Sequence, residues 1–118
     1  MLQKTSDLGR KAEDFAVKFL QDKGYIIVER NFRSRFGEID IISKDGGTLV
    51  FVEVKARWST KFGAPEEAVT PAKLYKIRKT VDYYCLVNNI TDVKMRIDVV
   101  AMEMSGQSIL SSRIIHVD

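Results

Sequence analysis

Two carboxylates and a lysine interrupt apolar, strand-like segments near the middle of the sequence. Asp40 stands among isoleucines, and Glu53 and Lys55 alternate with valines. Burying a charged side chain is costly unless a partner compensates the charge. Carboxylate oxygens are ligands that Mg²⁺ takes, commonly together with water and phosphate, and an ammonium group stabilises negative charge on a phosphate. These three residue types therefore suit a metal-dependent reaction on a phosphate ester.

The two segments predict a β-hairpin, and its turn decides whether the three charged side chains meet. Side chains alternate across a strand, so Glu53 and Lys55 share one face. A two-residue turn at Gly46–Gly47 places Asp40 directly opposite Glu53, with Cβ atoms roughly 4.5–5.5 Å apart. A four-residue turn from Asp45 to Thr48 gives the same pairing. A two-residue turn at Asp45–Gly46 shifts the register by two residues but keeps Asp40, Glu53 and Lys55 on one face of the sheet. A three-residue turn keeps them on one face only if a strand contains a bulge. Since opposed carboxylates repel each other, we expect Mg²⁺ or Mn²⁺ between them and Lys55 beside the metal.

Alternation makes two further predictions about the same strands. Ile39 and Ile41 should share the face opposite Asp40, and Glu38 should lie opposite Lys55. The alternative interpretation of the whole arrangement is a charged, solvent-facing side of an antiparallel hairpin.

A third carboxylate is expected on the first helix. At about 100° per residue, Glu13 lies at the margin of the apolar stripe, whereas Asp14 points well away from it. From the margin, the side chain of Glu13 can be directed along the sheet face. The alternative is a plain surface glutamate.

The elements that must position these residues follow from caps and periodicity. A helix is expected to begin near Leu8, capped by Ser6 or Asp7, and to end at Gly24. A second helix is expected to begin at Thr70–Pro71, where threonine suits the cap and proline the first turn. Five strands are expected at 25–32, 38–43, 48–57, 94–103 and 108–118. This order predicts one α/β domain over residues 1–118, with a mixed sheet of about five strands flanked by two main helices.

Composition restricts the class of protein. The chain has 118 residues, 45% of them hydrophobic and 30% charged, which is typical of one globular domain. It has no apolar run of membrane-spanning length and no secretory signal, so we expect no membrane association. Cys85 is the only cysteine, which fits a reducing, cytoplasmic location. The net charge of +3 is compatible with a polyanionic partner.

Taken together, these residues resemble the YraN-like family of uncharacterised bacterial proteins. That family belongs to the PD-(D/E)xK, or restriction-endonuclease-like, superfamily, which includes archaeal Holliday junction resolvases. The resemblance covers nearly the whole chain. It rests on four blocks in order, at residues 25–42, 49–57, 62–73 and 96–101.

The resemblance implies a restriction-endonuclease-like core and a role for each acid. Asp40 would be the first acid of the motif, Glu53 the second acid and Lys55 the motif lysine. Glu13 resembles the helical acid of the resolvase branch, which would make Glu13, Asp40 and Glu53 the metal ligands. Ile39 stands where the name of the superfamily has proline.

Basic residues near the acids are expected to bind phosphate. The candidates are Arg33, Arg35, Arg57 and Lys73, and Arg57 is the best of them because it shares the face of Glu53. A solvated basic surface is the alternative. Trp58 and Phe62 are candidates for stacking on bases, with core packing as the alternative. Two residues of the fourth strand, Arg96 and Asp98, are expected to form a structural pair, and His116 is also expected to be structural.

The sequence therefore predicts a metal-dependent endonuclease that acts on DNA, with branched and single-stranded DNA as options. The alternative is a nucleic-acid-binding module that has the same fold and no catalytic activity. A third option is a protein-interaction scaffold, with a homodimer formed through an exposed sheet edge.

Overall fold

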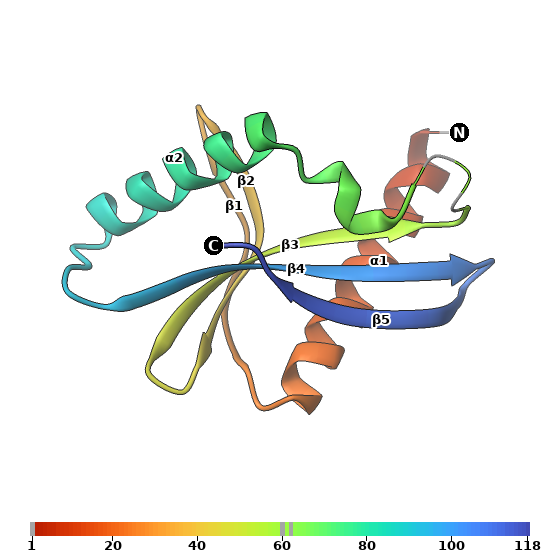
Figure 1. Cartoon of the computed structure of the whole chain (residues 1–118), viewed down its shortest axis with the longest axis horizontal. Helices are drawn as coiled ribbons and strands as arrows, with labels where there is room; N and C mark the ends of the chain where they lie inside the picture. Colours follow the sequence, from red (N-terminus) through yellow and green to blue (C-terminus); the bar gives the residue numbers. More distant parts are fainter. Residues whose placement is uncertain (1, 60, 62) are drawn as a thin grey trace.

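A five-stranded β-sheet forms the centre of the molecule, with its strands in the order β1-β2-β3-β4-β5 (Figure 1). The computed structural model describes the backbone of residues 2–59, 61 and 63–118 and, among these, the side chains from Asp7 onward. The strands are β1 (Ile26–Ser34), β2 (Gly37–Asp45), β3 (Thr48–Arg57), β4 (Lys94–Ser105) and β5 (Ser108–His116). The helices are α1 (Leu2–Asp22), α2 (Pro71–Val87) and the short 3-10 helix η1 (Pro65–Ala68).

The sheet is mixed, because β3 runs parallel to β4 while the other neighbouring strands pair antiparallel. A parallel pair needs a crossover connection, and η1 and α2 lie within the connection between β3 and β4. The predicted α/β fold, with a mixed sheet of about five strands and two main helices, is confirmed. In the part of the chain that the structure describes, no helix is long and apolar enough to cross a membrane.

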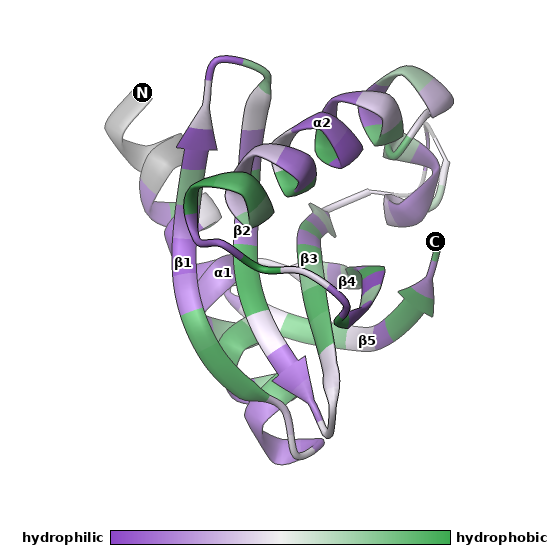
Figure 2. Ribbon diagram, turned by 90° about the vertical axis from the view of Figure 1, so that its left-hand side faces the viewer, coloured by the Kyte–Doolittle hydropathy of each residue, from purple (hydrophilic) through white to green (hydrophobic). Residues whose placement is uncertain are grey.

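The two long helices cover opposite faces of the sheet, and each encloses its own apolar cluster (Figures 1 and 2). On the α1 side, the buried residues include Ala12, Ala16, Leu20, Ile41, Val50 and Val52. On the α2 side, they include Ile39, Ile42, Phe51, Ile77, Val81 and Tyr84. Consecutive residues of β3 thus alternate between the two clusters, as predicted. The same alternation directs Glu53 and Lys55 toward the side of α2.

Caps predicted from the sequence fix one end of each long helix. Gly24 has a φ of 94°, and the backbone N–H groups of Gly24 and Tyr25 donate to the carbonyls of Gln21 and Leu20 at 2.9 and 3.0 Å. This is the Schellman arrangement that glycine favours, and it ends α1 where expected. At the start of α2, Thr70 caps the helix by accepting a hydrogen bond from a backbone N–H at 3.2 Å.

The predicted start of the first helix is wrong, since α1 begins at Leu2 rather than near Leu8. Ser6 and Asp7, which were expected to cap the helix, lie inside it. A serine or aspartate inside a helix costs less than about 0.7 kcal/mol relative to alanine. The leucine, glutamine and lysine that precede them are favourable helix residues, so the helix continues through the cap signal.

Candidate functional site

The β2–β3 hairpin opens into a fork at the level of the two acids. Its turn at Gly46–Gly47 pairs Asp45 with Thr48, which is the predicted register, and the pairing runs to Ile41 opposite Val52. Both strands continue past that pair. The expected continuation, with Asp40 directly opposite Glu53 and Glu38 opposite Lys55, is therefore not part of the ladder.

The fork explains a wrong prediction about β2. Ile39 and Ile41 were expected to share one face, but Ile39 packs in the cluster under α2 and Ile41 in the cluster under α1. The change of side occurs at Asp40, which is unpaired on both of its edges: the ladder with β3 ends at Ile41, and the ladder with β1 passes from Ile41 to Ile39 without it. Asp40 lies at this point, and its Oδ2 accepts a hydrogen bond from the backbone N–H of Val54 at 2.8 Å.

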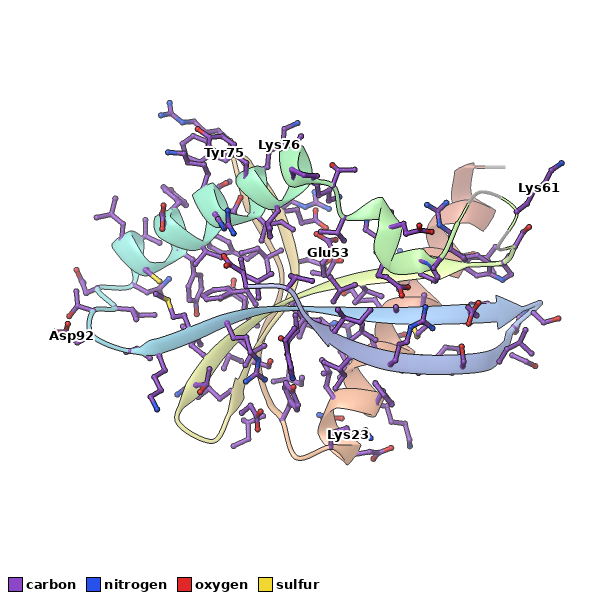
Figure 3. All side chains as sticks on the ribbon, in the orientation of Figure 1. Lys23, Glu53, Lys61, Tyr75, Lys76 and Asp92 are labelled. Atoms are coloured by element: carbon purple, nitrogen blue, oxygen red, sulfur yellow. The ribbon has the colours of Figure 1, made fainter. Side chains whose placement is uncertain are left out.

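A cleft of about 670 Å³ lies at the fork, with walls from α1, β2, β3 and α2. Figure 3 shows Glu53 between β3 and the N-terminal turns of α2, which carry Lys76. The charged and aromatic residues that line the cleft include Glu13, Asp40, Glu53, Lys55, Trp58 and Lys73. The β2–β3 hairpin and the two long helices thus each contribute polar residues to the lining of one open space.

Asp40, which is partly buried, and Glu53, which is buried, form a pair of carboxyl groups. Glu53 is only 6% exposed. Burial raises the pKa of Asp40 to about 7, and the hydrogen bond and the charge of Glu53 add to this rise, while the Val54 N–H and Lys55 oppose it. Asp40 is therefore close to half-protonated at neutral pH. A divalent cation can replace that proton, and two carboxylates are a donor set that Mg²⁺ accepts, so these residues fit the expected metal.

Lys55 lies beside the pair, with Nζ 4.0 Å from Glu53 Oε1. Burial lowers the pKa of Lys55, the negative charge of Glu53 opposes this effect, and the positive charge of Lys73 reinforces it. Lys73, which the sequence selected as a phosphate contact, therefore lies close to Lys55 in the cleft. Lys76 also lines the cleft. It lies three residues after Lys73, on the side of the helix that the sequence predicts for both lysines.

Glu13 lines the cleft, but its carboxylate is held by β1. Glu13 Oε1 accepts hydrogen bonds from Arg30 Nε and Nη2 at 3.1 and 3.0 Å and from Asn31 Nδ2 at 2.9 Å. Among the described residues, no group of three or more histidine, cysteine or acidic side chains is close enough together to hold a metal. The structure thus brings Asp40 and Glu53 together and leaves Glu13 apart from them.

The three predicted arginines lie outside the described lining of the cleft. Arg33 Nε bonds to Glu38 Oε2 at 2.8 Å, and the guanidinium of Arg35 lies 5.0 Å from the centre of the Phe36 ring. Arg57 lies at the end of β3, in register with a residue of β4. Phe62, the second stacking candidate, is not one of the described residues.

A second buried acid, Asp98, lies on β4 and has a different set of partners. Asp98 accepts hydrogen bonds from Arg96 Nε at 2.9 Å and from the Tyr25 hydroxyl at 3.1 Å, and His116 Nδ1 lies 2.7 Å from it. Arg96 Nη2 also donates to Asp45 at 3.0 Å. The predicted pair of Arg96 and Asp98 is confirmed. Asp98 is fully buried and its partners come from several strands and their borders, so this network ties the sheet together.

Comparison with known proteins assigns the chain to a family. The family model described as uncharacterised protein family UPF0102 matches residues 12–102. The chain belongs to UPF0102. A UPF0102 protein from Persephonella marina is 46% identical over 109 residues, which cover 92% of this chain and 88% of that protein. One from Desulforapulum autotrophicum is 50% identical over 95 residues, 80% of this chain and 78% of its own length. One from Neisseria meningitidis is 42% identical over 97 residues, 82% and 84% of the two chains.

The UPF0102 match covers the charged residues of the site. The matched residues begin before Glu13, include Asp40, Glu53, Lys55 and Lys73, and end within β4. The expected membership of an uncharacterised bacterial family is confirmed.

Proposed function

We propose that this UPF0102 protein is a metal-dependent nuclease that hydrolyses phosphodiester bonds in DNA. The observation that carries the proposal is the pair of Asp40, partly buried, and Glu53, buried, which line an open cleft beside Lys55. A carboxyl group in a cleft whose pKa is raised by burial and by a neighbouring carboxylate is typical of a functional site. The resemblance of the same three residues to the restriction-endonuclease-like motif supports this proposal.

Asp40 and Glu53 would hold Mg²⁺ or Mn²⁺. When bound, such an ion lowers the pKa of a water ligand and polarises a phosphoryl oxygen. The chain itself supplies a fixed geometry for this purpose. The hydrogen bond from the Val54 N–H to Asp40 Oδ2, at 2.8 Å, orients one of the two carboxylates on a strand.

We assign Lys55 to the reacting phosphate. Its ammonium stands at the edge of the carboxylate pair, 4.0 Å from Glu53 Oε1. There it can hold the attacking water or stabilise the negative charge that develops on the phosphate. Lys73, at the start of α2, would bind another phosphate oxygen of the DNA strand that is cleaved and so position the substrate.

Cleavage assays test the proposal. The purified protein is incubated with Mg²⁺ or Mn²⁺ and with duplex, branched and single-stranded DNA. We expect cleavage that EDTA abolishes and that Glu53→Gln lowers by at least about 100-fold, since removal of one group that stabilises the transition state has an effect of this size. Glu38→Gln is the matched control, because Glu38 lines the same cleft but is paired with Arg33. Equal trace cleavage by the wild type and by Glu53→Gln would refute the proposal.

The second candidate function is nucleic-acid binding without catalysis. It is favoured by the position of Glu13, whose carboxylate is held by Arg30 and Asn31 rather than directed at the acid pair. Under this alternative, DNA binding survives EDTA and the Lys55→Ala substitution, and no metal supports cleavage. DNA binding by the wild-type protein without cleavage in any metal would support the binding module and exclude the nuclease.

A further inference from the structure

Trp58 is the only tryptophan in the chain and stands at the edge of the cleft. It directly follows β3, three residues after Lys55. Among the described residues that line the cleft, it is the only aromatic side chain. It is 42% exposed, whereas a large aromatic ring normally lies mostly buried. An apolar ring beside a charged cleft suits a ligand that has both a flat face and a charge.

The indole of Trp58 is fixed by the protein. Its Nε1 donates a hydrogen bond to the backbone carbonyl of Gly106, in the turn between β4 and β5, at 2.8 Å. The polar edge of the ring is thus satisfied within the chain, which leaves the apolar surface of the ring for contact with a ligand. A ring held in this way loses little conformational entropy when it binds.

Trp58 borders two hollows, and the charged residues that line them indicate which hollow suits a nucleic-acid strand. Trp58 also lines a second hollow, of about 580 Å³, together with Glu103. The described lining of that hollow has no lysine or arginine, and its charged residue, Glu103, is paired with Arg113 at 3.4 Å. The cleft, by contrast, is lined by Lys55, Lys73 and Lys76 beside its acids. A nucleotide that contacts the indole therefore finds lysines for its phosphates in the cleft rather than in the hollow.

The chemistry of stacking restricts the form of the nucleic acid. In a duplex each base is stacked between its neighbours and shows only its edges to a protein, whereas an unpaired base can offer its face to an aromatic ring. The cleft, at about 670 Å³, is the size of a small-molecule pocket, which is roughly 300–1,000 Å³. It can thus admit an unpaired nucleotide, while paired bases stay outside.

We infer that the cleft binds nucleic acid in unpaired form, with one base stacked on Trp58 while Lys55, Lys73 and Lys76 contact the neighbouring phosphates. This rests on the proposed function for the class of ligand, and it does not depend on cleavage. It selects single-stranded DNA, or the unpaired part of a branched molecule, as the substrate class. Trp58 acts as a specificity-determining residue.

Fluorescence titration tests the inference directly, because all indole emission of the protein comes from Trp58. The probe is a short oligothymidylate in EDTA at low salt, so that no cleavage occurs. A sugar-phosphate oligomer of equal length without bases and a blunt duplex are the comparison probes. We expect the oligothymidylate to quench the emission and to bind at least about fivefold more tightly than the oligomer without bases. Equal affinity of these two probes without quenching, or tighter binding of the duplex, would overturn the inference.

Two variants separate stacking from support of the loop. Trp58→Ala should weaken oligothymidylate binding by about 5- to 150-fold, measured by the anisotropy of a labelled probe. Trp58→Phe keeps an aromatic ring but loses the hydrogen bond to Gly106, and it should retain most of the affinity. If Trp58→Phe is as weak as Trp58→Ala, the residue supports the loop and the inference is wrong. If oligothymidylate quenches Trp58 but no DNA is cleaved, only the proposed nuclease activity is rejected. If DNA is cleaved but Trp58 is not quenched, only the stacking of a base on Trp58 is rejected.

Discussion

The carboxylate of Asp40 accepts a hydrogen bond from the backbone N–H of Val54, on the strand from which β2 has just separated. A side chain thus takes the place that a backbone carbonyl would occupy in a longer ladder. This exchange satisfies the amide and leaves the second oxygen of the Asp40 carboxylate available to Glu53 or to a metal. The opening of the sheet and the placement of the acid are therefore one structural feature.

The first prediction concerns pH. The pKa of Asp40 is raised to about 7, above its ordinary value of 3.8, so the folded protein binds more protons than the unfolded chain between these values. The metal-free protein should therefore lose stability as the pH rises from about 4 to 7, by on the order of 3 kcal/mol. Urea unfolding in EDTA measures this loss. Asp40→Asn should flatten the dependence, and an unchanged slope in that variant would show that another group is responsible.

The second prediction concerns metal binding. Mg²⁺ or Mn²⁺ should raise the melting temperature at pH 8, where Asp40 has lost its proton and the metal can compensate its charge. At 100 times the dissociation constant the gain is about 2.7 kcal/mol. Glu53→Gln should remove most of this gain. Isothermal calorimetry at pH 6.5 should also show release of protons on metal binding. Absence of heat and of stabilisation with both ions would rule out the metal site.

The third prediction concerns Glu13. Its carboxylate is bound by Arg30 and Asn31, so Glu13→Gln should change metal affinity by less than about threefold, or roughly 0.7 kcal/mol. The matched comparison is Glu53→Gln, measured by the same calorimetric titration. A loss of tenfold or more in Glu13→Gln would mean that the helix acid leaves Arg30 and joins the metal.

The fourth prediction concerns the network around Asp98. This acid is fully buried and binds Arg96, so Asp98→Asn should lower the free energy of unfolding by about 3 kcal/mol. His116→Asn should cost less than about 1 kcal/mol, because the His116 side chain is 61% exposed. Urea denaturation compares the two variants. At low temperature, Asp98→Asn should bind the metal as tightly as the wild type, since Asp98 is not part of the described cleft lining. A loss of both stability and metal affinity in this variant would show that the Asp98 network and the cleft are coupled.

Much of the site could be predicted from local sequence. The Gly46–Gly47 turn fixes the register of the β2–β3 hairpin, and alternation then places Asp40 near Glu53. The threonine and proline at the start of α2 fix where Lys73 stands. These features depend on residues close together in the chain, which is why a single sequence is enough to predict them.

The rest depends on contacts between distant segments. The binding of Glu13 by Arg30 requires the helix and β1 to lie side by side, and no periodicity in either segment indicates it. Ile39 and Ile41 pack in separate apolar clusters, one under each long helix, whereas the alternation within the segment predicts a single face for both. Arg33 was a reasonable phosphate ligand by charge alone, but its pairing with Glu38 follows from the register of β1 with β2.

The parallel pairing of β3 with β4 also has a consequence for the order of folding. The strands β1, β2 and β3 are joined by short turns and can pair locally, whereas β4 must wait until the long crossover through α2 has closed. Local pairings form faster than distant ones. Asp40 and Glu53 would therefore meet in a nascent three-stranded meander before the lysines of α2 arrive, while the pair is still open to water and dissolved ions.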